Sequence, residues 1–403
     1  MTTPSSEEVG GPLSGLRVVD LTQVLSGPFC TMLLADLGAD VVKVEPPGGD
    51  ASRAWGPHPA TTGDQGPTYG GYFASVNRNK RSICLDLTTA SGREDLLGLL
   101  EQADVLVENF RVGVMDRFGL SYELLHERFP RLVYACIRGF GDPRTGRSPY
   151  AQWPAFDIVA QAMGGVMSVT GLDADHPVKV GPGIGDIFPA ALAAVGLLAA
   201  VRHADASGEG QLVDVAMYDA VLSLTERIVY QHSMTGTSPV PQGNTHPLLC
   251  PYGLVATGDG HVAVAAPSDH HWQLLSRIIE RPELAHDPRY ATNAARLASA
   301  AEVYAAIEAW SRERTTYEVV SALAGHVPCG PLNTAADIAR DPHVAARDMI
   351  VELDHPAGGT VSVAGSPIKF SSTRSRVSTR APMLSEHTEA ILAELRAAAG
   401  QAP

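Results

Sequence analysis

The strongest constraint on the fold is a repeated alternation of short apolar runs with segments of helical spacing, which continues from Leu16 to Arg138. The first repeat predicts a strand at 16–21, a helix that begins near Ser26 and a strand at 39–45. A strand, a helix and a strand within about 30 residues form a βαβ unit, with parallel strands and a right-handed crossover. The alternation therefore predicts a parallel sheet.

The later repeats extend the same sheet. They predict strands at 82–87, 104–109 and 132–138, with helices at 91–103 and 121–129. We therefore expect an α/β fold built on an open, Rossmann-like parallel sheet that helices cover on both faces. Such sheets bind ligands at the carboxyl ends of their strands. The first strand-to-helix turn lacks the Gly-x-Gly-x-x-Gly fingerprint, which argues against a nicotinamide dehydrogenase.

The pattern changes after about residue 222. Residues 252–257 and 261–266 alternate apolar positions around Gly258-Asp259-Gly260, which predicts a hairpin, and helical patterns follow at 272–279, 301–310 and 317–324. These features place a smaller α+β domain at 223–332. The chain then returns to short strands at 350–353 and 361–363. It ends in a helix that the run 385–389 is expected to cap.

Composition, charge and motif spacing argue against several classes of protein. The 403 residues suggest two domains, and the net charge of −14 argues against nonspecific binding to nucleic acid. The longest apolar run, 187–201, is shorter than the roughly 18 residues of a membrane span. Five cysteines without Cys-x-x-Cys spacing predict free thiols in a reducing compartment, and we expect a cytoplasmic protein. No histidine pair has metal-site spacing, and no Gly-x-Ser-x-Gly elbow of a hydrolase occurs.

Asp186 is the most informative single residue. It follows three glycines within the run 180–189, and glycine lets the backbone approach a ligand closely. Two compatible roles are open at this point. Asp186 is a good N-cap for a helix that starts at Ile187. It is also placed as a carboxylate nucleophile that a reactive electrophile such as a thioester could reach.

Several separated motifs together resemble the class III CoA-transferases, the CaiB/BaiF family. The likeness runs from about residue 13 to residue 392, in the family's order. It includes the opening block with Leu37-Gly-Ala-Asp-Val-Val-Lys-Val-Glu45 and the run Asn77-Arg-Asn-Lys-Arg-Ser82. The other matching segments are 13–21, Gly27-Pro28, 107–113 with Arg117, 208–217 and 328–331.

The resemblance implies that Asp186 is the nucleophile. CoA would pass between two carboxylic acids through an acyl-aspartyl anhydride and an aspartyl-CoA thioester, with acyl-CoA as substrate and with no metal or redox cofactor. An aspartate of ordinary pKa would need no base to ionise it. The residues implied in binding CoA are Val24, Leu25, Lys80, Asn109, Phe110, Val114 and Arg117. From the residues alone, Phe110 would be a core aromatic, and Lys80 and Arg117 surface charges.

The resemblance also implies an architecture. A large discontinuous domain, residues 1–222 and 333–403, would bind CoA, and the small α+β domain, residues 223–332, would be inserted in it. Two such chains would form an interlocked homodimer, with neither nucleic acid nor membrane as a partner.

Departures from the family pattern bear on the reaction. The racemase branch has a histidine where Ala155-Phe156-Asp157 places Phe156, and a phenyl ring exchanges no proton. A racemase or epimerase of CoA thioesters is therefore the disfavoured alternative. Leu25 replaces a glutamine of the oxalate-specific branch, which disfavours oxalate. A CoA-thioester-binding protein without turnover is the alternative from another class. The donor and acceptor acids stay open, with succinyl-CoA and a small dicarboxylate as the expectation.

Overall fold

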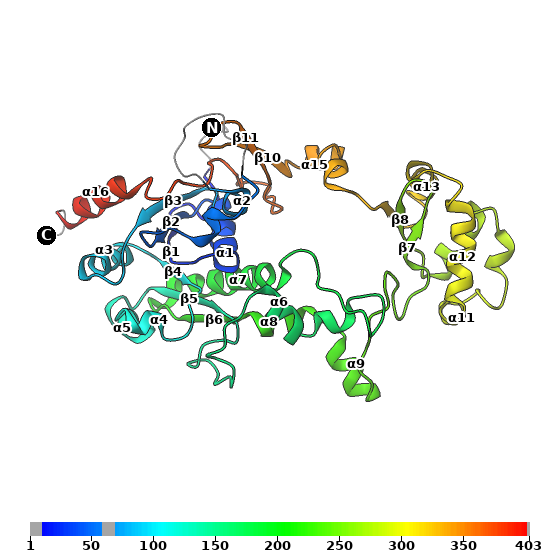
Figure 1. The fold of residues 1–403 in the computed structure, drawn as a ribbon, viewed down its shortest axis with the longest axis horizontal. Coiled ribbons are helices and arrows are strands. Elements are labelled where there is room, and N and C mark those ends of the chain that lie inside the picture. Colours follow the sequence, from blue (N-terminus) through cyan, green and yellow to red (C-terminus); the bar gives the residue numbers. More distant parts are fainter. Residues whose placement is uncertain (1–9, 59–68, 401–403) are drawn as a thin grey trace. The chain divides into compact units, whose positions relative to one another are not determined.

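The computed structural model describes residues 10–58 and 69–400, and the chain folds into two compact units (Figure 1). The large unit takes in the chain up to Val166, Val180–Tyr230 and the chain from Pro342 onward. The small unit consists of Met167–Lys179 and Gln231–Asp341. These limits fall later than the predicted boundaries at 222 and 332, and 167–179 was not expected in the small unit.

The large unit contains a six-stranded sheet whose strands all run parallel, in the order β3-β2-β1-β4-β5-β6. The predicted α/β fold with an open parallel sheet is confirmed. The sequence order reverses between β1 and β4, and such a switch point is where open sheets of this kind bind ligands. The strands are β1 (Arg17–Asp20), β2 (Asp40–Glu45), β3 (Lys80–Cys84), β4 (Val105–Glu108), β5 (Val133–Arg138) and β6 (Leu212–Ala216).

Helices cover both faces of this sheet (Figure 1). Alternate strand residues point to opposite faces, so Val18 and Val19 belong to two different cores. On one face the core joins Val18 to α1 (Ser26–Asp36) and α7 (Ile184–Ser207). On the other face it joins Val19 to α3 (Ala90–Glu101), α5 (Tyr122–Arg128) and α16 (Thr388–Ala399).

Shorter helices complete the large unit and join it to the small one. They are α2 (Gly71–Val76), α4 (Val114–Arg117), α6 (Asp157–Met163), α8 (Met217–Leu224), α9 (Ile228–Thr235) and α15 (Pro342–Ala346), with 3₁₀ turns at Ala51–Ala54 and Val166–Val169. The predicted strands near the end of the chain form an antiparallel pair, β10 (Ile350–Asp354) and β11 (Thr360–Ala364).

Helix α7 is longer than the apolar run 187–201, because it begins at Ile184 and continues to Ser207, with Pro189 inside it. By length and composition alone it could cross a membrane, with a mean hydropathy of 2.0 over its most apolar window, of which 39% is buried in the protein. Its buried residues include Ala190, Ala193 and Leu197, which pack in the core against the sheet. A core helix of this kind passes the same test of composition.

The expected cap of the last helix is wrong. The N-cap position of α16 is His387, and among the residues described no side chain caps this helix. The segment pairs instead with the edge strand β3. The Ser82 N–H donates to Nδ1 of His387 (3.2 Å), and the Cys84 N–H donates to Thr388 Oγ1 (3.2 Å). Covering an edge strand in this way satisfies donors that would otherwise pair with another chain.

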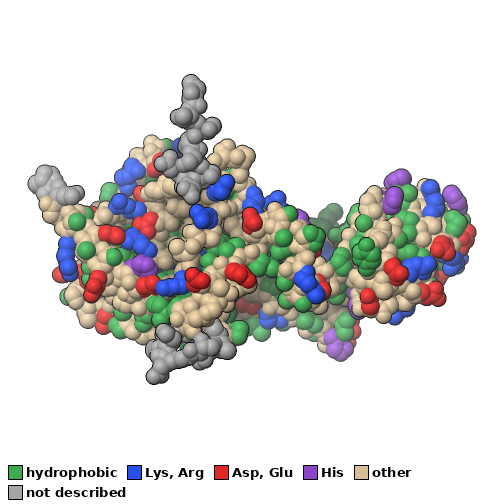
Figure 2. Space-filling model, turned by 90° about the horizontal axis from the view of Figure 1, so that it is seen from above, with side chains coloured by type: hydrophobic (Ala, Val, Ile, Leu, Met, Phe, Trp, Pro, Cys, Tyr) green, Lys and Arg blue, Asp and Glu red, His purple; other side chains and the backbone are tan. Residues whose placement is uncertain are grey.

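The small unit is an α+β assembly. The predicted hairpin is confirmed as β7 (Tyr252–Ala256) and β8 (His261–Ala265), and β9 (Cys329–Pro331) extends it to three antiparallel strands. Its core includes Val262, Trp272 and Ile307. The helices are α10 (Asp269–Ile278), α11 (Asn293–Ala298), α12 (Ala300–Ser311), α13 (Thr316–Leu323) and α14 (Ala335–Ile338), with a 3₁₀ turn at Pro282–Ala285. Basic and acidic side chains are interspersed over the face of the molecule seen in Figure 2.

Candidate active site

Asp186 lies in the first turn of α7, as its third residue, and it is partly buried. The helix begins at Ile184 and its N-cap position is Gly183, so the expectation that Asp186 caps a helix starting at Ile187 is wrong. Among the described residues, no group donates a hydrogen bond to the Asp186 side chain. Its carboxylate is therefore left available to a ligand.

The cap of α7 comes from another helix. Asp157, the first residue of α6, accepts a hydrogen bond from the Gly185 N–H at Oδ1 (2.8 Å). Both of its carboxylate oxygens also accept from Gln161 Nε2, at 2.9 Å each. A carboxylate at a helix N-terminus satisfies a free N–H and interacts favourably with the helix dipole. Asp157 therefore fills the role that the local pattern suggested for Asp186.

The Asp186 carboxyl group has an unusual acidity. Burial, and then the nearby charge of Asp157, raise the pKa of Asp186 to about 7. The expectation of an ordinary pKa is therefore wrong, because Asp157, 29 positions earlier in the sequence, lies beside this carboxyl group only in the folded chain. Burial, followed by the Asp186 charge, also raises the pKa of Tyr72 on α2 to about 12, so this phenol stays protonated at neutral pH.

Asp186 lines a cavity of about 340 Å³ at the carboxyl ends of β1, β4 and β5. The position is the switch point of the sheet, where the order of the strands reverses. Five of the seven residues predicted to bind CoA line the same cavity: Val24, Leu25, Asn109, Phe110 and Val114. The structure therefore brings the predicted nucleophile together with most of the predicted ligand-binding residues.

The turn after β1 is held in a strained conformation. Val24 has a φ of 69°, which a β-branched residue rarely adopts and which costs on the order of 1–3 kcal/mol. Asn109 holds Gln23, the residue before Val24, because its side-chain amide accepts from the Gln23 N–H (2.9 Å) and donates to the Gln23 carbonyl (2.8 Å). The Val24 N–H points to the Asp50 carboxylate, at 3.2 Å from Oδ2. Ser26 then donates to the Asp186 carbonyl (3.0 Å), which joins this turn to α7.

A buried ion pair fixes Phe110. Arg138, at the end of β5, pairs with Glu108, at the end of β4, and with Asp142. Glu108 accepts a hydrogen bond from the Phe110 N–H (2.6 Å), and Arg138 Nε donates to the Phe110 carbonyl (3.2 Å). Burial raises the pKa of Glu108 even though Arg138 opposes it. Arg138 lines the cavity but was not predicted as a site residue, although a charged residue that ends an apolar strand was the available signal.

Comparison with known proteins agrees with this geometry. The model of CoA-transferase family III matches residues 13–388. The chain belongs to CoA-transferase family III.

The relatives of this transferase cover nearly the whole chain. It is 51% identical over 385 residues to a succinyl-CoA:mesaconate CoA-transferase of Haloarcula hispanica, covering 95% of this chain and 96% of that protein. It is 38% identical over 386 residues to a succinate–glutarate CoA-transferase of Agrobacterium fabrum, covering 95% and 96%. The crystal structure of a CaiB/BaiF family protein from Brucella suis matches with a TM-score of 0.85 and 38% identity, covering 96% of this chain and all of that one.

Two of the predicted CoA-binding residues do not line the Asp186 cavity. Arg117 lies at the end of α4. The Lys80 side chain is fully buried, and its ammonium donates to Asp20 (3.0 Å), Asn77 Oδ1 (2.9 Å) and the Pro28 carbonyl (3.0 Å). These bonds use its three N–H donors, so a phosphate contact would require one of them to break. Contact with CoA stays a prediction for both residues.

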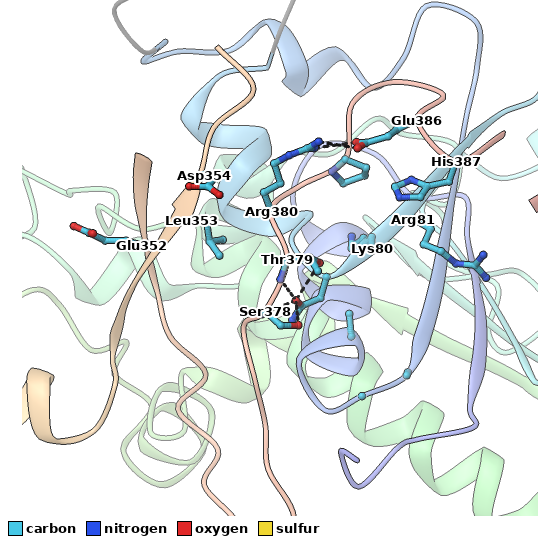
Figure 3. A pocket seen from close by; sticks show the side chains of 15 residues that line it. Lys80, Arg81, Glu352, Leu353, Asp354, Ser378, Thr379, Arg380, Glu386 and His387 are labelled. Carbon is cyan, nitrogen blue, oxygen red and sulfur yellow. Dashed lines mark hydrogen bonds and ion pairs between the residues drawn. The ribbon is translucent and has the colours of Figure 1, made fainter. Parts of the chain in front are cut away.

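A larger cavity, of about 740 Å³, lies elsewhere in the large unit, and Asp186 does not line it (Figure 3). Its basic side chains Lys80, Arg81 and Arg380 are paired within the protein. Arg380 points toward Glu386, with a distance of 2.7 Å between Nη2 and Oε1. Arg81 pairs with Asp40 (2.7 Å) and Glu394 (2.8 Å). The smaller cavity, which Asp186 lines together with five predicted CoA-binding residues, is therefore the candidate active site.

Within residues 10–58 and 69–400, no group of three or more histidine, cysteine, aspartate or glutamate residues could hold a metal ion. The five cysteines are free, as their spacing predicted, and Cys30, Cys136 and Cys250 are buried.

Proposed function

We propose that the protein transfers CoA from an acyl-CoA to a carboxylic acid by covalent catalysis at Asp186. One observation carries the proposal. The Asp186 carboxylate, to which no described residue donates a hydrogen bond, lines the cavity at the switch point together with five expected CoA-binding residues, in a helix that another residue caps. A carboxylate in this position is a nucleophile that needs only to lose its proton.

The proposed reaction proceeds in four acyl transfers. An Asp186 oxygen attacks the donor thioester, the carbon–sulfur bond breaks, and the products are an acyl-aspartyl anhydride and CoA thiolate. The thiolate attacks the aspartyl carbonyl, which gives aspartyl-CoA and releases the donor acid as a carboxylate. The acceptor carboxylate then attacks aspartyl-CoA, which forms a second anhydride and frees the thiolate. The thiolate finally attacks the acceptor carbonyl, which yields the new acyl-CoA and restores Asp186.

Backbone donors near Asp186 are suited to stabilising the oxyanions of these steps. Helix α1 begins at Ser26, beside Asp186, and among the described residues no side chain caps it. The N–H groups of an uncapped first turn are free to donate, and they carry the positive end of the helix dipole. Donors aimed at a developing oxyanion contribute several kcal/mol to acyl transfer.

We propose succinyl-CoA as the donor and a short dicarboxylic acid, with mesaconate tested first, as the acceptor. The support is the likeness to transferases whose names specify succinyl-CoA with mesaconate and succinate with glutarate. Phe156 lines the cavity and is 62% exposed, so the side chain at the position of the racemase histidine offers no base. We further propose a cytoplasmic, interlocked homodimer that acts without a metal or redox cofactor.

Mass spectrometry of the purified protein tests the proposal. With succinyl-CoA and a panel of mono- and dicarboxylic acids, we expect new acyl-CoA products, with mesaconyl-CoA among the most abundant. With succinyl-CoA alone, the peptide that contains Asp186 should carry CoA, and borohydride should reduce this thioester. Transfer that proceeds without any adduct on Asp186 would overturn the covalent route. Deuterium uptake at the α-carbon without acid exchange would favour the racemase instead.

A further inference from the structure

Asp157 is connected to the nucleophile through two clamps on the segment that precedes it. The first clamp is its hydrogen bond with the Gly185 N–H, at 2.8 Å, within the first turn of α7. The contact is close, because a Cβ at Gly185 would lie 2.6 Å from the Asp157 carbonyl oxygen and 3.0 Å from Oδ1. Any residue with a side chain at position 185 would therefore separate α6 from α7.

Gln161 forms the second clamp, one helical turn further along α6. Its side chain is fully buried. Its Nε2 donates to both Asp157 oxygens, and its Oε1 accepts from the Val180 N–H at 3.0 Å. Nε2 also lies 3.4 Å from the Val180 carbonyl and 3.5 Å from the Pro182 carbonyl. The Asp157–Gln161 pair thus holds both ends of the segment 180–185, which leads directly into Asp186.

On this geometry we propose that Asp157 is a positioning residue for the transfer reaction, which holds the 180–185 segment and the first turn of α7 so that the Asp186 carboxylate faces the cavity. The inference rests on the proposed function of Asp186. An aspartate in a first turn ordinarily bonds the free N–H groups of its own helix. Because Asp157 already occupies the Gly185 N–H, the Asp186 side chain is not drawn into that role.

The charge of Asp157 adds a second effect. After burial, it is the cause that raises the pKa of Asp186 to about 7. Besides Asp157, the titratable groups on this side of Asp186 among the described residues are Tyr72, from α2, and Arg111 and Arg138, which line the cavity. A carboxylate with a raised pKa is more basic and hence a better nucleophile once it is ionised. Asp157 therefore links the placement of Asp186 to its reactivity.

Two substitutions separate placement from charge. Asp157→Asn removes the charge and one of the two oxygens that accept from Gln161, but its remaining oxygen can still accept from the Gly185 N–H and from Gln161 Nε2. The acidic limb of the pH–rate profile should therefore move to lower pH by about one unit. Asp157→Ala removes the first clamp, the hydrogen bond with the Gly185 N–H. The value of kcat should then fall by about a hundredfold, with KM for acyl-CoA nearly unchanged. Asp205→Asn, an exposed change of equal charge near the far end of α7, is the matched control and should leave both quantities unaltered.

The outcomes are distinguishable from a failure of the proposed function. The CoA adduct on Asp186 is measured first in the wild-type protein, and its absence there would refute the proposed function. If the wild type forms the adduct but both Asp157 variants form it at the wild-type rate and with the wild-type pH limb, Asp157 is not a positioning residue. If Asp157→Ala fails to fold, Gln161→Ala, which removes only the second clamp, should still lower kcat at unchanged KM, and a wild-type kcat would contradict the inference.

Discussion

Two sets of buried charges in the large unit differ in one respect, which is whether each acid has a basic partner. Near β1 to β3, Asp20 pairs with Lys80 (3.0 Å) and Asp50 pairs with Lys43 (3.1 Å). Burial alone would raise the pKa of Asp20, but Lys80 and Lys43 outweigh burial and hold this pKa below its usual value. At the cavity, Asp186 has a second carboxylate beside it in place of a cation, and its pKa rises. The comparison separates a structural charge cluster from a reactive one.

The largest expected effect comes from replacing Asp186, the reactive carboxylate of this comparison. Asp186→Asn should lower transfer by at least about a thousandfold, because an amide cannot form the anhydride. The fold should persist, since Asp157 and not Asp186 caps α7. Initial rates of acyl-CoA formation and circular dichroism of the same sample measure the two effects. Activity within tenfold of the wild type would contradict covalent catalysis.

The second prediction concerns the structural charge cluster and removes its Asp20–Lys80 ion pair. Lys80→Met leaves Asp20 buried without one of its cations, so the free energy of unfolding should fall by about 3–5 kcal/mol. Denaturant titration measures this loss. Arg81→Met is the matched control, because Arg81 is 28% exposed and its partners are more exposed still, so the loss should be under about 1 kcal/mol. A stable Lys80→Met protein with weakened CoA binding would instead support the predicted contact of Lys80 with CoA.

The third prediction concerns the pH dependence of the reactive carboxylate. Only ionised Asp186 attacks a thioester, and its pKa is raised to about 7. The value of kcat/KM should therefore rise with pH through about 7 and then level off. Rates measured from about pH 5.5 to about pH 8.5 would show the limb. A profile that is already flat at pH 6 would mean that Asp186 ionises like an exposed aspartate.

Local patterns predicted the sheet well, because the spacing of apolar residues that distinguishes a strand from a helix is visible in neighbouring residues. Five of the six parallel strands were expected within a few residues of their observed limits. The sixth, β6, lies in the matched motif 208–217 but was not predicted as a strand. Its residues are mostly half-buried, which weakens the apolar signal. Helix α2, Gly71–Val76, was not predicted either.

The details of the site depend on contacts between distant residues, which the sequence does not display. Asp186 was expected to cap its own helix because aspartate is a good N-cap and an apolar run follows it from Ile187. The helix starts earlier because Asp157, from α6, supplies the cap. In the same way, Lys80 was expected to be a ligand contact or a surface charge because nothing near it in sequence shows that Asp20 faces it. The order of motifs along the chain was enough to locate the candidate site. The roles of Asp157 and Lys80 could be assigned only from the residues they contact in the folded chain.

The smallest expected effect concerns how Asp186 and Asp20 change the free energy of unfolding with pH. A raised folded-state pKa means that Asp186 contributes stability below its unfolded value, near 3.8, and that this contribution is lost as pH rises toward about 7. Asp186→Asn should therefore stabilise the protein at pH 8 by about 1–2 kcal/mol, after an allowance for partial exposure, and by less at about pH 4.5. Asp20 has the opposite sign, because its pKa is lowered and its contribution is lost as pH falls through the folded value.

Urea midpoints at the two pH values test this difference. Asp205→Asn, on the exposed surface near the end of α7, should show little change at either pH, since its partner Arg131 is also exposed. Equal stability of Asp186→Asn and the wild type at both pH values would mean that the dipole of α7 compensates the burial and the charge of Asp157. The folded protein would then hold Asp186 ionised without cost, and the contrast with Asp20 would lie in hydrogen bonding alone.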